Sequence, residues 1–237
     1  MEQQDSKVIH FPVHRRGTLS DTLTGFRARE AAPAWNASRR EQQVTLVVAD
    51  IRGHDGLARR MGTPTAVAAV RRALSGGIGA LRSNGGQRIA VGGGNSQPVV
   101  CAEFAHPRHA LTALVAATDL RDAVHASGDE LEACIGVNSG SVVEATLSAG
   151  PPIVYRAMAT VRMFAVRLQE FAGPGQIFVS ATTRAGIHPA LARFRSIGPV
   201  RTNAGGETTE AFALEELSAA ARTGEQLNTA RRAPGGA

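Results

Sequence analysis

The chain has 237 residues, which suits one domain of ordinary size with tails and is marginal for two. Hydrophobic residues make up 43% of it and aromatic residues only 4%, so we expect a packed core built mainly from Ala, Val, Leu and Ile. The formal net charge of +6 permits a nucleic-acid or acidic-membrane partner. The arginines are scattered, however, and no basic arm of about five like charges forms, so nucleic-acid binding is not favoured.

Neither a membrane span nor a secretory signal is indicated. No apolar run approaches the roughly 18 residues that a spanning helix needs, and the polar N-terminus lacks the apolar centre of a signal peptide. We therefore expect a cytoplasmic protein. Cys101 and Cys134 both lie in apolar segments, which favours two reduced core thiols and leaves a disulfide as the alternative.

Residues 1–43 are polar, lack sustained periodicity and are interpreted as a flexible N-terminal arm. Within this arm, residues 8–13 form a short apolar segment, and residues 19–32 could form a short helix that Pro33 ends. Two interpretations stay open. The arm either carries a docking peptide for an unknown protein partner or is a disordered tail.

Residues 44–214 carry the clear patterns of a folded domain. Residues 44–49 form a short apolar run typical of a buried strand, ending at Asp50. A helix is expected to open at Thr63-Pro64 and to end at Gly85-Gly86, with these apolar positions at helical spacing: Val67, Val70, Leu74, Ile78 and Leu81. A hairpin should follow, with arms 88–91 and 99–104 around a loop of Gly, Asn, Ser and Pro.

The second half continues the alternation of helices and strands. The expected elements are a helix 107–124, a strand 131–137, a turn 138–140, a strand 141–147, a helix 156–171, a strand 176–180 and a strand pair 194–198 with 210–214. Residues 215–237 are interpreted as a flexible C-terminal tail with one short helix. This order predicts an α+β fold with a ferredoxin-like core, in which helices pack on one side of a mainly antiparallel sheet.

Five segments in this order resemble class III adenylyl/guanylyl cyclase catalytic domains: residues 44–58, 85–86, 135–143, 155–168 and 174–180. The resemblance implies the nucleotide cyclase fold and a homodimer, or a heterodimer with another cyclase-like domain, whose site lies between the two domains. It also implies a nucleoside triphosphate as ligand, with Mg or Mn held against its phosphates.

The resemblance assigns roles to particular residues. Asp50 matches the first metal carboxylate, and backbone N–H groups of Ile51, Arg52, Gly53 and His54 match the phosphate loop. Thr160 matches a base-reading position on the helix 156–171, and Arg167 matches the arginine that supports the transition state. For three of these the plainer alternatives stay open. Asp50 could be a turn aspartate, Thr160 could be an ordinary helix residue, and Arg167 could be a surface residue paired with Glu170.

Three other positions depart from the family pattern. The second metal carboxylate belongs in the hairpin loop 92–98, which contains none, and Asn95 there offers only a neutral oxygen. Ala90 stands where the family has a base-reading lysine, and Met163 where it has a ribose-positioning asparagine.

These departures predict a catalytically impaired pseudoenzyme that acts as a dimeric signalling, regulatory or nucleotide-binding module. Two alternatives remain. The chain is either an atypical active adenylate/guanylate cyclase, releasing cyclic nucleotide and pyrophosphate, or a basic nucleic-acid-binding protein.

Overall fold

A computed structural model describes residues 38–92, 98–128, 130–147, 153–202 and 207–223. The expected helix 19–32, the apolar segment 8–13 and Asn95 lie outside these ranges. Inside them, the predicted α+β fold with a mainly antiparallel sheet is confirmed.

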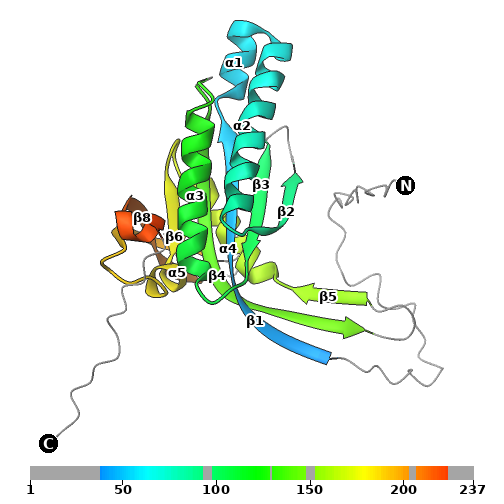
Figure 1. The fold of residues 1–237 in the computed structure, drawn as a ribbon, viewed down its shortest axis with the longest axis vertical. Helices are drawn as coiled ribbons and strands as arrows, with labels where there is room; N and C mark the ends of the chain where they lie inside the picture. The colour runs from blue at the N-terminus through cyan, green and yellow to red at the C-terminus, as the bar shows by residue number, and fades with distance from the viewer. Residues whose placement is uncertain (1–37, 93–97, 129, 148–152, 203–206, 224–237) are drawn as a thin grey trace, which may run out of the picture.

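The described strands form one sheet of eight strands (Figure 1). The path across the sheet is β2 (Gln87–Gly92), β3 (Val99–Phe104), β1 (Ser38–Arg52), β4 (Glu132–Leu147), β6 (Ile177–Ser180), β8 (Thr208–Leu217) and β7 (Ala192–Arg201). The short strand β5 (Ile153–Ala157) pairs with the C-terminal half of β4. Every pairing is antiparallel except that of β4 with β6.

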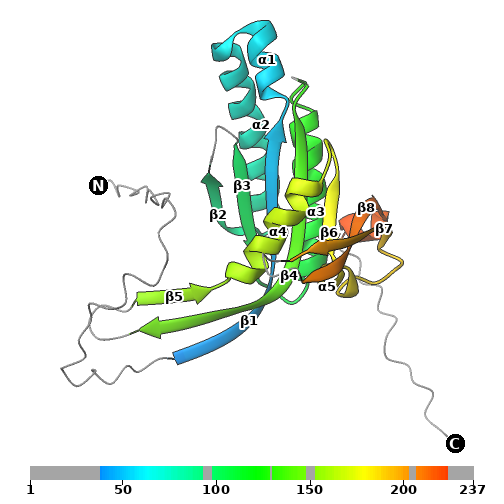
Figure 2. The same ribbon diagram turned by 180° about the vertical axis from the view of Figure 1, so that it is seen from behind.

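The helices cover both faces of the sheet, so the expectation that they lie on one side is wrong. The described helices are α1 (His54–Met61), α2 (Thr63–Ser83), α3 (His109–His125), α4 (Ala159–Phe171), α5 (Ala181–Ala185) and α6 (Ala219–Thr223). Helices α2 and α3 lie on one face and α4 on the other, as Figures 1 and 2 show.

The sequence of β1 explains this two-sided packing. Val47 and Ala49 belong to the core cluster under α2 and α3, whereas Leu46 and Val48 belong to the cluster under α4. Because successive side chains of a strand point to opposite faces, an uninterrupted apolar run requires cover on both sides.

The turn expected at residues 138–140 is also absent, because β4 runs through it and pairs with β1 from Arg52↔Glu132 to Ser38↔Thr146. Its turn-forming residues serve close packing instead. Asn138 is buried and donates its Nδ2–H to the Val161 carbonyl at 2.9 Å. A Cβ on Gly140 would lie 2.8 Å from Cγ2 of Val161, so any larger residue would force Val161 to shift where α4 crosses the strand.

Other boundaries differ by a few residues from those expected. Strand β1 begins at Ser38 rather than at residue 44, and α3 begins at His109. Residues 153–157 form β5, and α4 begins only at Ala159. The outer parts of β1 and β4 together with β5 project below the helices as an extension of the sheet (Figure 2). None of the described helices is long and apolar enough to cross a membrane.

Candidate functional site

Asp50 is the most unusual polar residue of the sheet because its side chain is only 1% exposed. It lies near the end of β1, between Val99 on β3 and Cys134 on β4, on the face that α4 covers. Its Oδ2 lies 3.2 Å from Nε of Arg52 and 3.5 Å from Nε2 of Gln169. Its Oδ1 is buried and has no hydrogen-bond partner among the described residues. A buried oxygen without a partner is costly, which is typical of a ligand position.

In the structure, the first part of the segment 51–54, which the resemblance matches to a phosphate loop, belongs to strand β1. Strand β1 continues to Arg52, and the N–H of Ile51 donates to the Pro98 carbonyl at 3.2 Å, so it is engaged within the protein. Gly53 follows with φ 101°, and a Cβ there would lie 2.5 Å from the Glu130 oxygen, so only glycine fits. The chain therefore reaches the N-terminus of α1 at Gly53 and His54, where the helix dipole favours an anion.

His54 is held in place at this turn. Its Nδ1 lies 3.1 Å from the Ile51 carbonyl, and its Nε2 lies 3.5 Å from Oδ1 of Asp55. The imidazole is therefore fixed beside the start of α1 by contacts from both sides.

The donor set around Asp50 suits at most one metal ion. Among the described residues, no group of three or more His, Cys, Asp or Glu side chains is placed to hold a metal. Glu103 lies on the same face but is 2% exposed and takes a 2.9 Å hydrogen bond from Nη1 of Arg88. A divalent ion at Asp50 would therefore draw its other oxygen ligands from phosphates and water, as Mg²⁺ commonly does.

Strand β2 is the hairpin arm where the resembled family has a lysine that contacts the base. Here it carries Arg88, which is paired with Glu103. Arg88 has φ 46° at an irregularity of β2, and its guanidinium contacts Glu103 and, at 3.9 Å, Glu144. Ala90 lies opposite Cys101 and is exposed. This arm thus presents a methyl group and an engaged arginine beside the α4 face of the sheet.

Helix α4 has an exposed side and a buried side, and the residues matched to the cyclase family lie on different sides from Gln169. Thr160, Met163 and Arg167 follow one another at helical spacing and are all exposed. The buried side of the helix carries Gln169, which reaches Asp50. Positions two apart point in nearly opposite directions on a helix, so Arg167 faces away from the Asp50 of its own chain.

Arg167 is instead paired at the surface. Its Nη1 lies 2.9 Å from Oε2 of Glu170, which is the plainer of the two interpretations of the sequence. Met163 and Phe171 are exposed on the same helix. The structure therefore brings Asp50, Arg52, Gly53 and His54 together at one end of β1 and leaves Thr160 and Arg167 on a separate exposed surface.

Gln169 contacts Asp50 but was not among the residues predicted from the sequence. It is buried within an otherwise apolar stripe of α4 that includes Ala165 and Leu168. A polar residue in such a stripe is the signal that could have identified it, because buried polar groups are nearly always hydrogen-bonded.

Both cysteines are free thiols. Burial raises the pKa of Cys134 to about 11, an effect that Arg52 opposes and Asp50 reinforces. Burial likewise raises the pKa of the Cys101 thiol. Both thiols therefore stay protonated at neutral pH.

A second polar cluster lies on the α3 face of the sheet. Thr45 connects His109 Nδ1 at 2.6 Å with the Ser139 hydroxyl at 2.7 Å, and Ser139 contacts Thr183 at 3.0 Å. The Thr183 hydroxyl donates to the Val137 carbonyl. The Ser180 hydroxyl also lies 2.9 Å from the Thr183 hydroxyl, so this chain of polar contacts joins His109 to the end of β6.

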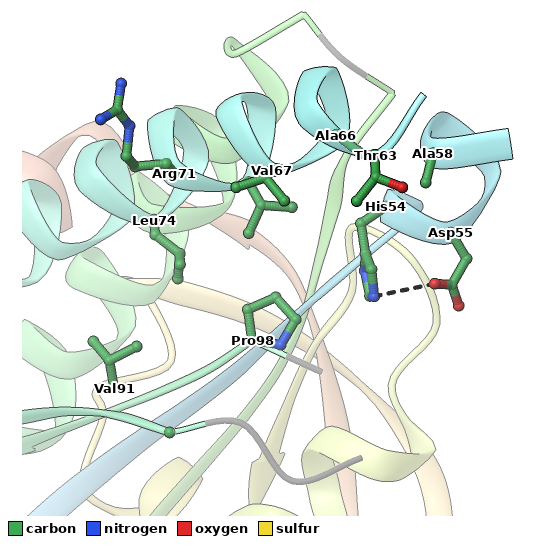
Figure 3. Close-up of a pocket in the computed structure, with 12 residues that line it drawn as sticks. His54, Asp55, Ala58, Thr63, Ala66, Val67, Arg71, Leu74, Val91 and Pro98 are labelled. Atoms are coloured by element: carbon green, nitrogen blue, oxygen red, sulfur yellow. Dashed lines mark ion pairs between the residues drawn. The ribbon is translucent and has the colours of Figure 1, made fainter. Parts of the chain in front are cut away.

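A groove of about 730 Å³ lies between α1, α2 and the β2–β3 hairpin (Figure 3). Its lining is mostly apolar and comprises His54, Asp55, Ala58, Thr63, Ala66, Val67, Val70, Arg71, Leu74, Val91, Gly92 and Pro98. His54 links the groove to the turn after Asp50. We name it the α2 groove.

Comparisons with known proteins identify the fold. No protein-family profile and no curated protein sequence matches the chain. Solved structures do match, among them the adenylyl cyclase CyaB from P. aeruginosa, with TM-score 0.62 and 16% identity over 77% of this chain and 98% of that chain. Another is the guanylate cyclase domain of RhGC from Catenaria anguillulae in complex with GTP, with TM-score 0.59 and 18% identity over 76% and 100% of the two chains.

A third match is an adenylate/guanylate cyclase/hydrolase from Silicibacter pomeroyi, with TM-score 0.53 and 19% identity over 74% of this chain and 97% of that chain. The chain thus has the fold of class III adenylyl/guanylyl cyclase catalytic domains, as its sequence predicted.

Proposed function

We propose that this chain is a catalytically impaired, dimeric cyclase-homology domain that binds a nucleoside triphosphate through one metal ion at Asp50. The observation that carries the proposal is the buried carboxylate of Asp50, whose Oδ1 is unpartnered and which belongs to no group of three or more potential metal-ligating His, Cys, Asp or Glu side chains among the described residues. A single ligand position supports phosphate binding better than it supports turnover.

The chemistry explains why one carboxylate is too few for efficient turnover. Cyclisation requires attack of the ribose 3′-oxygen on the α-phosphorus and departure of pyrophosphate, and metal ions supply charge neutralisation for both oxygens. Here Asp50 would hold one ion, and the N-terminus of α1 at Gly53 and His54 would face the phosphates. Glu103 is occupied by Arg88 and supplies no second ligand.

Dimerisation is supported by the exposed surface of α4. Met163 and Phe171 place apolar side chains in water beside Thr160 and Arg167. Burial of this surface against a second chain would stabilise a dimer. The resemblance implies that Arg167 would then serve the site between the two chains. In the resembled family an asparagine at the position of Met163 positions the ribose. The Met163 side chain would not donate a hydrogen bond to the ribose.

A second candidate is an atypical active cyclase. It is favoured by Asp50, Thr160 and Arg167, which stand at the positions where the resembled family has working residues. In that case the metal at Asp50 and an Arg167 from the partner chain would have to suffice for the reaction.

Binding of non-hydrolysable ATP and GTP analogues with Mn²⁺ tests the proposal. We expect Mn²⁺-dependent binding to the full chain, its loss in Asp50→Asn and its retention in Asp122→Asn, an acid on α3 that is 50% exposed. Met163→Asp should shift the chain from dimer to monomer in analytical ultracentrifugation. Equal binding by wild type and Asp50→Asn, or a monomeric wild type, would overturn the proposal.

A further inference from the structure

Several apolar side chains that line the α2 groove are exposed to solvent. Val67 is 61% exposed and Val91 is 55% exposed, although both line the same hollow. Figure 3 shows Val67 and Leu74 of α2 facing Pro98 and Val91 of the hairpin across the groove, while the Arg71 guanidinium points away from it. Exposed apolar surface of this kind typically marks a site that another segment covers.

The groove adjoins an open sheet edge. Strand β2 is the first strand of the described sheet and pairs only with β3 there. Ile89 of β2 packs on the core under α2, and Val91, two residues on, shares its face. An open edge beside an apolar groove suits an extended segment, which can pair through its backbone and insert alternate side chains.

The chain itself contains one segment with the required pattern. In residues 8–13, Ile9, Phe11 and Val13 alternate with Val8, His10 and Pro12, so an extended conformation gives one wholly apolar face. Pro12 lacks an N–H and is tolerated only where its nitrogen points away from the partner strand. That requirement directs the backbone groups of residues 9, 11 and 13 towards β2.

We propose that residues 8–13 add to the free edge of β2 as an extra strand within the same chain, with Ile9 and Phe11 inserted into the α2 groove. This contact is independent of the proposed nucleotide binding. It assigns the N-terminal arm an internal docking site in place of an unknown protein partner. With its nitrogen on the outer side of the added strand, Pro12 would offer no N–H there, which would hinder pairing with any further strand.

The length of the arm permits this contact. Ala49 of β1 lies level with Val100 of β3, which pairs with Val91 of β2. The path from Ser38 to that level is about 35 Å along β1, and the three strand spacings from β1 to the outer side of β2 add about 14 Å. Residues 14–37 can span up to about 80 Å, so residues 8–13 reach β2 without strain.

Hydrogen exchange of the full chain tests the docking directly. We expect the β2 amides to exchange about tenfold or more slowly in the wild type than in an Ile9→Asp, Phe11→Asp variant. A Val8→Asp, His10→Asp variant alters the other face of the same segment and should keep the protection. Val67→Asp should remove it, whereas Ser75→Asp, also exposed on α2, should not. Identical exchange in wild type and Ile9→Asp, Phe11→Asp would overturn the proposal.

A cross-link identifies the occupant of the groove. In a Phe11→Cys, Val67→Cys variant we expect mild oxidation to give a disulfide within one chain, and a Phe11→Cys, Ser75→Cys variant should give none. A disulfide found only between two chains, or no disulfide in the first variant, would overturn docking within the chain.

Discussion

The carboxylate of Asp50 lies 3.2 Å from the guanidinium of Arg52, two residues along the same strand face. Arg52 is partly exposed, whereas Asp50 is buried with Oδ1 unpartnered. The pair therefore satisfies one carboxylate oxygen and leaves the other without a hydrogen-bond partner among the described residues.

We predict that Asp50→Asn leaves the free energy of unfolding within about 1 kcal/mol of wild type, or raises it, because a buried carboxylate with an orphan oxygen costs more than a neutral amide. The same variant should lose the thermal stabilisation that Mn²⁺ and nucleotide give to wild type. Thermal unfolding with and without these ligands measures both. A large loss of stability with the ligand response intact would show that Asp50 is structural.

The contact between β4 and α4 should be intolerant of any side chain at Gly136. A Cβ there would lie 2.0 Å from the Ala165 oxygen and 2.4 Å from the Gln169 nitrogen, which is backbone against backbone. We predict that Gly136→Ala lowers the free energy of unfolding by about 3 kcal/mol or more.

Gly79→Ala in α2 is the matched control, because a Cβ at that exposed position meets nothing within 4 Å. It should raise the free energy of unfolding by about 0.5 kcal/mol through helix propensity. Chemical denaturation measures both variants, and equal effects would refute the close packing of α4 on β4.

Most helices and strands within residues 44–214 were predictable, since each depends on local apolar periodicity, whereas the packing of helices on both faces of the sheet was not predicted. The turn at residues 138–140 was not. Asn138, Ser139 and Gly140 have turn chemistry locally, and only the approach of α4 reveals their buried roles. The position of Asp50 was predicted, but its contact with Gln169 joins residues 119 positions apart and has no local signal beyond one polar residue in an apolar stripe. The α2 groove likewise depends on how α2 meets the hairpin.

Arg88 should stabilise the fold through the buried Glu103. Arg88→Ala removes the cation 2.9 Å from a carboxylate that is 2% exposed, so we predict a loss of about 1–3 kcal/mol in the free energy of unfolding. Adding Glu103→Gln should recover part of that loss in a double-mutant cycle. Arg193→Ala, which breaks an exposed pair with Glu216, should change stability by less than about 0.5 kcal/mol. Purely additive effects at residues 88 and 103 would contradict the pairing.

His109 should make stability depend on pH. Burial, with a smaller contribution from His106, lowers the pKa of His109 below its ordinary value of 6.5. The unfolded chain therefore binds this proton more readily, so the stabilisation is complete above pH 6.5 and is lost as the pH falls through the lowered pKa. His109→Gln should flatten the decline in unfolding free energy below pH 6.5, and the exposed His188→Gln should not. Parallel pH profiles for wild type and His109→Gln would contradict this expectation.

The most direct test of impaired catalysis is incubation of the purified full chain with ATP or GTP and Mn²⁺ or Mg²⁺, followed by mass spectrometry for cyclic nucleotide. With the protein folded and dimeric, we predict no more product than from the Asp50→Asn variant. Product that wild type and Asp122→Asn form, and that Asp50→Asn does not, would contradict the account and would identify the chain as an active cyclase.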